Sequence, residues 1–337
     1  MNDLATTNRT IVVASRPTKK PGPENFAEKA VPVRTSEDGE VLVESLYLSI
    51  DPAMRVWLEE DPGYVAPLAI GDVMRAFGVG RVSTSRYAGL SVGDFVAGRL
   101  GWQSQPTLQG ASLNKLDLDL GTPVDWLGPL GTTGLTAYFG ILRIGQLKAG
   151  ETVLVSAAAG AVGQMVGQIA RLHGARTVGI AGGAEKCALV TDEFGFDQAI
   201  DYKAEDDMAA AIGGACHDGV DVYFDNVGGE ILDGALANIR QKGRVVVCGR
   251  ISQTAGRRQG LYNTGQLIGR RARMEGFIVT DFEDEFDDAQ RWLAERLKAG
   301  KIHQKIHVLD GLEQAPEGLR MLFAGENIGK MVVKVGA

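Results

Sequence analysis

The chain has 337 residues, which suggests two domains or one large one, and its 45% hydrophobic share excludes disorder as the main state. Its 35 basic and 42 acidic side chains give a net charge of −7, which makes it a poor nucleic-acid binder because phosphate contacts need clustered positive charge. The 45 glycines show no collagen period, so we assign them to turns and close backbone approaches.

The first 125 residues predict strands and turns. The first thirteen residues lack a basic region followed by an apolar core, so we expect no signal peptide. Ile11–Val13 and Val41–Tyr47 are β-rich, frequent glycines punctuate the rest, and no long helical period occurs before about residue 128.

From about residue 128 to 300 the pattern alternates between short apolar runs and helical periodicity, which predicts βαβ units and a parallel sheet. The apolar runs are Thr152–Ser156, Thr177–Ala181, Val220–Asp225, Arg244–Gly249 and Met274–Val279. From about 301 the chain returns to short strands around one helix, about Glu313 to Ala324. We therefore expect one domain from 1–127 and 301–337 and a second from 128–300.

Two segments invite other interpretations. The uncharged run Thr152–Ala170 is interrupted by glycines, so we do not expect a membrane helix and predict no membrane partner. Six carboxylates occupy Asp281–Asp288, which fits a metal site or an acid pair; we favour the solvated first turn of a helix running through Trp292 and Leu297.

Cysteine and histidine are informative by position. The three cysteines, at 187, 216 and 248, are too scattered for a disulfide framework, which favours a reducing, cytoplasmic setting. Residues 1–172 contain neither cysteine nor histidine, so we expect no zinc site there and assign no metal ligands.

The most informative segment is VLVSAAAGAVGQMVGQIARLHGARTVGIAGG, residues 153–183. A strand runs into Ala158-x-Gly160-x-x-Gly163, and then come a helix ended by Gly174 and a second strand ending at Ala181. This is the context of a dinucleotide fingerprint, with an alanine in place of its first glycine. Gly160 would let the backbone approach a pyrophosphate, and Gly163 would let the helix pack on the strand.

The end of the second strand selects the cofactor. A carboxylate there would bind the ribose 2′-hydroxyl of NAD, but the sequence has Gly182, and Lys186 follows shortly after. We therefore predict NADP, with the alternative that Lys186 is only a surface helix residue. Because no zinc set is available in the first 172 residues, alcohol oxidation is disfavoured, and hydride transfer to an enone, an enal or a quinone is favoured.

Several blocks resemble the zinc-independent medium-chain dehydrogenase/reductases, and within them the alkenal/one double-bond reductases. The blocks are LSIDPAMR (48–55), GLTAYFGIL (134–142), AAAGAVGQMVGQIA (157–170), EKCALV (185–190), DYK (201–203), YFDNVGGE (223–230), GRVVVCGRIS (243–252), RMEGFIV (273–279) and NIGKMVVKV (327–335). The resemblance covers most of the chain. It implies an α/β fold in which a Rossmann domain is inserted in a GroES-like, β-rich catalytic domain, and a homodimer.

The resemblance also implies NADP(H) as cofactor and reduction of the C=C bond of α,β-unsaturated aldehydes or ketones. The residues it places against the cofactor are Gly160, Ala161, Val162, Gly163, Lys186, Tyr202, Asn226, Cys248, Gly249, Ile251, Ser252, Phe277, Ile278, Val279 and Asn327. Lys186 and Tyr202 would meet the 2′-phosphate. Cys248 and Phe277 fit strand-end core equally well, and the two asparagines fit turns.

Two departures concern the substrate. The family carries tyrosine where this chain has Ala53 and Thr254, which widens the expected pocket around Ala53, Arg55 and Tyr262. Donation to the enolate then falls to Thr254, Tyr262, the cofactor ribose or water. Arg257 and Arg258 fit a solvated loop, or contacts to an acidic substrate or the 2′-phosphate.

The leading hypothesis is an NADPH-dependent enone or enal reductase. One alternative keeps the cofactor and reduces quinones or enoyl thioesters. A second is a non-catalytic NADPH-binding protein, for which the two missing tyrosines would be signs of lost activity.

Overall fold

The computed structural model describes residues 6–63, 65–253 and 260–336, and the chain divides into two compact units. Met1–Leu127 and Ile306–Ala337 form the β-rich unit, and Gly128–Lys305 forms the α/β unit. The second border lies five residues beyond the expected one. His303 and Lys305 belong to the α/β unit because their backbone N–H groups donate to the side chains of Gln168 and Gln164 on its helix α3 (Ala161–Leu172).

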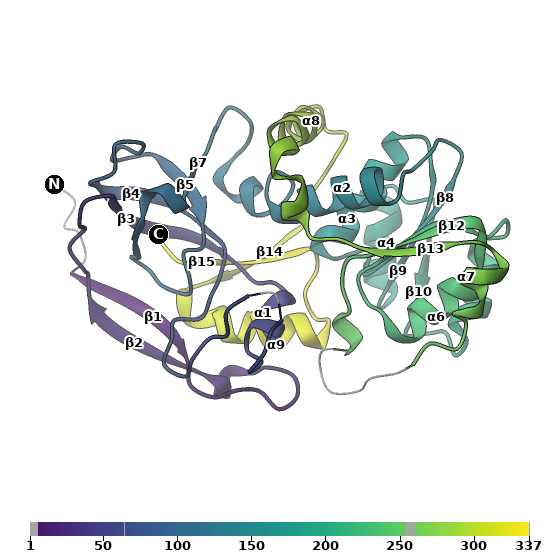
Figure 1. Cartoon of the computed structure of the whole chain (residues 1–337), viewed down its shortest axis with the longest axis horizontal. Coiled ribbons are helices and arrows are strands. Elements are labelled where there is room, and N and C mark those ends of the chain that lie inside the picture. Colours follow the sequence, from purple (N-terminus) through teal and green to yellow (C-terminus); the bar gives the residue numbers. More distant parts are fainter. Residues whose placement is uncertain (1–5, 64, 254–259, 337) are drawn as a thin grey trace. The chain divides into compact units, whose positions relative to one another are not determined.

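Antiparallel pairing dominates the β-rich unit. A two-stranded ribbon pairs β1 with β2, and a larger sheet follows the order β14-β15-β3-β4-β5-β7, with β6 paired to β3 (Figure 1). The strands are β1 (Thr7–Val13), β2 (Phe26–Pro32), β3 (Glu40–Ser49), β4 (Gly78–Ser85), β5 (Phe95–Gly98), β6 (Thr107–Gln109), β7 (Asn114–Lys115), β14 (Ile306–Asp310) and β15 (Lys330–Lys334). Its α-helices are the short α1 (Ala53–Trp57) and α9 (Ala315–Ala324).

The α/β unit is built on a six-stranded sheet of parallel strands in the order β10-β9-β8-β11-β12-β13. The strands are β8 (Thr152–Ser156), β9 (Arg176–Ala181), β10 (Gln198–Asp201), β11 (Val220–Asp225), β12 (Ile239–Val247) and β13 (Arg273–Gly276). The helices are α2 (Thr132–Phe139), α3 (Ala161–Leu172), α4 (Ala184–Ala188), α5 (Met208–Ala215), α6 (Gly229–Ala237), α7 (Gly265–Gly269) and α8 (Phe286–Lys298). The predicted α/β fold class and parallel sheet are confirmed.

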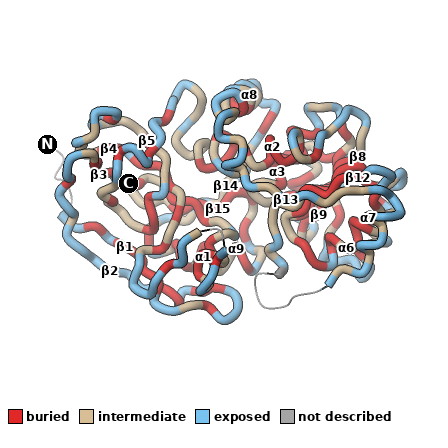
Figure 2. Tube along the Cα trace, in the orientation of Figure 1, coloured by how far each residue is buried: buried red, intermediate tan, exposed pale blue. Residues whose placement is uncertain are grey.

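The core of the α/β unit explains this order. The central strands β8 and β11 are buried along their whole length, which suits their continuous apolar runs (Figure 2). Helices α5 and α6 share one apolar cluster with the sheet, in which Ile212, Ala235 and Leu236 are fully buried. Such a sheet presents the carboxyl ends of all its strands at one edge.

Two expected elements differ from the structure. β13 ends at Gly276, and residues Val279–Glu285 form a 3₁₀ segment, because the Ile278 N–H donates to the Asp281 carboxylate and turns the chain. The acidic run therefore lies on this segment and on the first turn of α8. β12 begins at Ile239, earlier than expected. The apolar pattern did not reveal this start because the residues that follow Ile239 are polar and exposed.

Candidate functional site

The strand order of the α/β unit has its topological switch point between β8 and β11. Chain connections lead outward in opposite directions from these two strands, and ligands of open α/β sheets bind outside the carboxyl ends at such a point. Ser156 ends β8 and Asp225 ends β11. The glycine-rich segment predicted to bind phosphate follows Ser156 directly.

Glycine occupies positions 160 and 163 of this segment for different structural reasons. A Cβ at Gly163 would lie 2.2 Å from the Ala157 carbonyl oxygen and 2.8 Å from the Ala158 Cα, so close packing of α3 on the loop requires glycine. A Cβ at Gly160 would lie 3.1 Å from the Ala157 carbonyl oxygen and 3.9 Å from the Ala157 Cβ, and its φ of −85° suits any residue. The backbone conformation therefore does not require glycine at this position, and packing disfavours a side chain there much less than at Gly163.

The alanine that replaces the first glycine of the fingerprint is accommodated by β9. Ala158 is fully buried, and its Cβ would lie 2.8 Å from a Cβ built on Gly179. The missing side chain at Gly179 thus makes room for the Ala158 methyl group. The backbone stays in register because the Ala158 N–H donates to the Ile180 carbonyl over 3.0 Å.

The ends of β9 and β10 form the region predicted to select NADP. The Tyr202 ring lies against Gly182, where a Cβ would be 2.7 Å from a ring carbon, so this ring fills the position of the usual NAD-binding side chain. Asp201 holds the two ends together by accepting from the Gly183 N–H over 2.7 Å and the Lys203 N–H over 3.0 Å. Tyr202 itself is 42% exposed.

Positive charge gathers at the same place. Burial, and then the charge of Lys203, lowers the pKa of Lys186, with a smaller opposite effect from Glu185. The Lys203 charge disfavours the charged form of Lys186, and an anion bound beside both ammonium groups would offset that effect. Lys203 was not named as a cofactor residue from the sequence, although it stands in the DYK block.

The turn after β11 is organised by a buried carboxylate. Asp225 is 1% exposed, and its Oδ1 accepts from the Tyr223 hydroxyl at 2.8 Å and from the Gly228 N–H at 2.8 Å. Burial raises the pKa of Asp225, while these donors oppose the rise. Burial and Asp225 also raise the pKa of Tyr223 well above its ordinary value. Asp225 was not identified from the sequence, because nothing in it marks one acid as buried.

The predicted residues around this turn are brought together. The Asn226 side chain donates to the Ser156 carbonyl over 2.8 Å, which joins β11 to β8. The N–H groups of Cys248 and Gly249 both donate to the Asp225 carbonyl at 2.9 Å, and the Ser252 hydroxyl donates to the Val227 carbonyl at 2.7 Å. Burial, followed by the Asp225 charge, raises the pKa of Cys248 to about 12.

The other predicted residues lie at separate places. Phe277 packs near Gly140, where a Cβ would lie 2.8 Å from its ring, and Ile278 is exposed. Tyr262 is 83% exposed, and its N–H donates to Asp233 of α6. Thr254, Arg257 and Arg258 lie outside the described residues.

Three further predicted residues belong to the β-rich unit. Ala53 is half-buried at the start of α1. Arg55 is buried, and its guanidinium donates to the carbonyls of Lys19 and Pro17 and pairs with Glu59. Asn327 is buried, with its amide donating to the Gly329 carbonyl over 2.9 Å.

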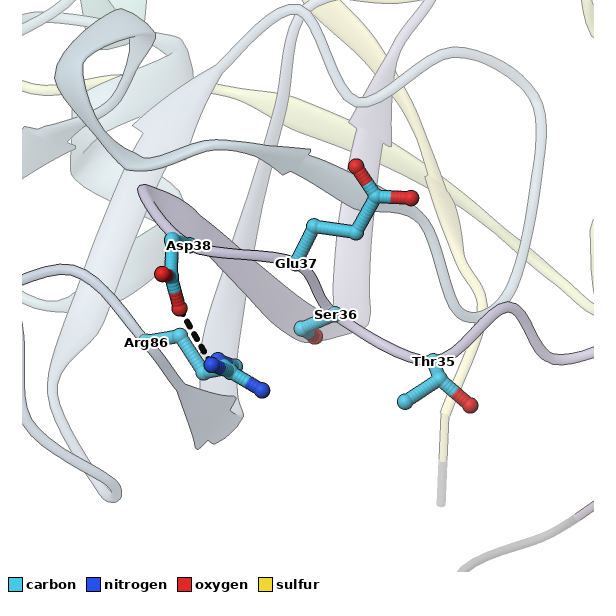
Figure 3. Close-up of a pocket in the computed structure, with 5 residues that line it drawn as sticks. All are labelled: Thr35, Ser36, Glu37, Asp38 and Arg86. Carbon is cyan, nitrogen blue, oxygen red and sulfur yellow. Dashed lines mark hydrogen bonds and ion pairs between the residues drawn. The ribbon is translucent and has the colours of Figure 1, made fainter.

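A separate open pocket in the β-rich unit is lined by Thr35, Ser36, Glu37, Asp38 and Arg86 (Figure 3). Its Arg86 and Asp38 form an exposed ion pair with each other. No predicted site residue lines it, so we do not assign it to the site. Within residues 6–63, 65–253 and 260–336, no three histidine, cysteine or carboxylate side chains are grouped to hold a metal ion, and no helix is both long and apolar enough to cross a membrane.

Comparisons with known proteins agree with this architecture. Residues 9–116 match the family model described as the N-terminal domain of oxidoreductase, and residues 161–295 match the one described as zinc-binding dehydrogenase. The chain is 40% identical to the NADPH-dependent curcumin reductase of Escherichia coli (strain K12) and to the NADP(+)-dependent 2-alkenal reductase of Nicotiana tabacum, covering 97% of each chain in both cases. The crystal structure of CurA in complex with NADPH from Vibrio vulnificus is 40% identical over 98% of this chain and 99% of that one, with a TM-score of 0.93.

The β-rich unit, the parallel sheet with its glycine loop and these matches define a medium-chain dehydrogenase/reductase. The similarity to the reductases extends over nearly the whole chain. Within the superfamily, the chain belongs to the alkenal/one double-bond reductase group.

Proposed function

We propose that this chain is an NADPH-dependent reductase that reduces the C=C bond of α,β-unsaturated aldehydes or ketones. The single observation that carries the cofactor assignment is Gly160 at the N-terminus of α3, a glycine that its backbone conformation does not require and that packing within the protein favours only weakly. Family membership carries the reaction class. Named relatives at 40% identity act as a curcumin reductase and a 2-alkenal reductase.

The residues present fit the whole length of the dinucleotide. Gly160–Gly163 and the free N–H groups of α3 would receive the pyrophosphate. Lys186, Lys203 and the Tyr202 ring would receive the 2′-phosphate, and the absence of a carboxylate at Gly182 removes the feature that favours NAD. Asn226 and the segment from Cys248 to Ser252 would line the nicotinamide half at the end of β11.

Bound there, the nicotinamide supplies a hydride to carbon. The chain's task is to position the alkene and to hold the enolate oxygen with a hydrogen-bond donor. Tyr262 is a candidate donor whose exposed hydroxyl is open to solvent, and Thr254 is the other. Ala53 leaves more room than the family's tyrosine, which favours bulky or aromatic enones.

The test is NADPH oxidation at 340 nm with enals, cyclic and aromatic enones, and quinones, each repeated with NADH. We expect turnover of enals or enones with NADPH and much weaker turnover with NADH. Turnover of quinones alone would assign the chain to quinone reduction. Tight NADPH binding without turnover of any acceptor would identify a cofactor-binding protein that is not a reductase.

A further inference from the structure

A buried lysine in the β-rich unit has no place in the function described so far. Lys330, the first residue of β15, is 2% exposed. Its Nζ donates to Asp51 Oδ1 over 2.6 Å, to Ser49 Oγ over 2.5 Å and to the Ile50 carbonyl over 3.4 Å. The Ser49 hydroxyl also donates to the Asp51 carboxylate. Every hydrogen of the ammonium group thus has an oxygen partner from three consecutive residues.

These three partners lie just before α1, the helix that begins with Ala53, the residue proposed to lie on the substrate side. Ser49 ends β3 and pairs with Val332 of β15, and the Asp51 carbonyl accepts from the Met54 N–H over 3.1 Å at the start of α1. Lys330 therefore holds Asp51, which lies two residues before Ala53, the first residue of α1.

The far end of α1 is held in a similar way by a second cation. The Arg16 guanidinium donates to the carbonyls of Leu58 over 2.7 Å and Glu59 over 3.0 Å, just beyond the last turn. A helix of five residues has little stability of its own, so its position depends on such attachments.

Lys330 also directly follows the turn that contains Asn327, a residue proposed to lie on the cofactor side. Asn327 lies three positions earlier, and its amide donates to the carbonyl of Gly329, the residue directly before Lys330. One ammonium group thus connects the turn of Asn327 with the start of α1.

We infer that Lys330 is a positioning residue, and that its ion pair with Asp51 sets the placement of Ala53 on the substrate side relative to Asn327 on the cofactor side. This inference rests on the proposed function. Stability alone is a weak reason for such a pair, because apolar residues of similar volume often replace a buried ion pair without loss. Directional bonds to three oxygens fix a geometry that apolar packing leaves less defined.

The experiment compares Lys330→Met, Asp51→Asn and the double variant with Glu151→Gln. Glu151 forms a similarly buried ion pair with Arg244, at 2.6 Å, in the α/β unit. It directly precedes β8 and so lies at the amino end of the strand, away from the predicted site. Each single variant at Asp51 or Glu151 removes the carboxylate partner of a buried cation, which makes Glu151→Gln the matched control.

Three quantities are measured for each protein: Tm, the Kd of NADPH by fluorescence, and the KM and kcat of an aromatic enone. We expect Asp51→Asn, Lys330→Met and the double variant to raise the enone KM and the NADPH Kd about 10-fold or more, because small displacements of positioning groups are costly. The double variant recovers Tm, since no buried charge is left alone, but not the kinetic constants. Glu151→Gln lowers Tm and leaves those constants at the wild-type values.

The inference is overturned if the Lys330 and Asp51 variants lose only Tm and keep wild-type constants. It is also overturned if the double variant, once refolded and stable, binds NADPH and enone normally. Should the wild type bind NADPH but reduce no enone, the proposed function fails, and the NADPH Kd decides the inference alone. A raised Kd in the double variant then supports it, and an unchanged Kd refutes it.

Discussion

Substituting alanine for each glycine of the α3 loop separates the demands of the fold from those of the ligand. In Gly163→Ala the new methyl group would lie 2.2–2.9 Å from three backbone atoms of Ala157 and Ala158, which cannot rotate away. Overpacking of this kind costs about 3 kcal/mol, and the better helix propensity of alanine returns about 1 kcal/mol. The expected net loss of about 2 kcal/mol lowers the Tm by roughly 4–8 °C for a unit of this size.

Gly160→Ala has the opposite profile. Its methyl group would lie 3.1 Å from the Ala157 carbonyl oxygen, a contact that a small shift relieves, so we expect a Tm within about 2 °C of wild type, since loss of a glycine N-cap is the main cost. The same methyl group occupies the space through which the pyrophosphate would approach, and we expect the NADPH Kd to rise at least about 10-fold.

Thermal unfolding without cofactor and fluorescence titration with NADPH measure the two effects in the same samples. Because Val166, Ile169 and Ala170 of α3 are fully buried, the Tm reports directly on how α3 packs. A Gly160→Ala protein that binds NADPH as tightly as wild type would refute the assignment of this glycine to the ligand. A Gly163→Ala protein with unchanged Tm would refute the packing argument.

Three other outcomes are expected. Because burial and Lys203 lower the pKa of Lys186, NADPH affinity should fall as pH rises toward that lowered value, and Lys186→Arg should flatten the profile; parallel curves in Kd titrations would contradict this. Burial raises the pKa of Cys248 to about 12, whereas burial and then Asp201 raise the pKa of Cys187 by a smaller amount, so mass spectrometry should find enal or iodoacetamide adducts at Cys187 before Cys248. Ala53→Tyr should lower kcat/KM for bulky aromatic enones more than for small enals; equal losses in a substrate series would argue against Ala53 as a pocket residue.

The cofactor side could be predicted from the sequence because its signals are local. The loop from Ala158 to Gly163 follows a strand and opens a helix, and these elements appear where expected. Gly179 was different: it makes room for the methyl group of Ala158 in the loop after β8, and only the parallel pairing of β8 with β9 brings the two together.

Residues whose role depends on distant partners could not be identified. In the sequence, Lys330 looks like any surface lysine. Its partner Ser49 lies 281 positions earlier, and only the pairing of β15 with β3 brings the two together. Asp225 likewise looks like a polar strand end, although the fold surrounds it with donors from its own turn. Strand ends were also uncertain where the chain remains apolar, as after Gly276, because a turn made by one side chain, Asp281, ends β13.

The turn organised by Asp225 limits which substitutions such a protein can accept during evolution. Through Asn226, Cys248 and Gly249 it ties together β8, β11 and β12, so substitutions in this turn, which we propose to line the nicotinamide, also weaken the middle of the sheet. Ala53 is only half-buried on a short helix held from both ends by backbone carbonyls and one ion pair. New side chains at that position cost the fold little. On the proposed assignment, descendants of this chain can acquire new substrates by exchanging residues on α1, while the residues proposed to receive the dinucleotide are inherited almost unchanged.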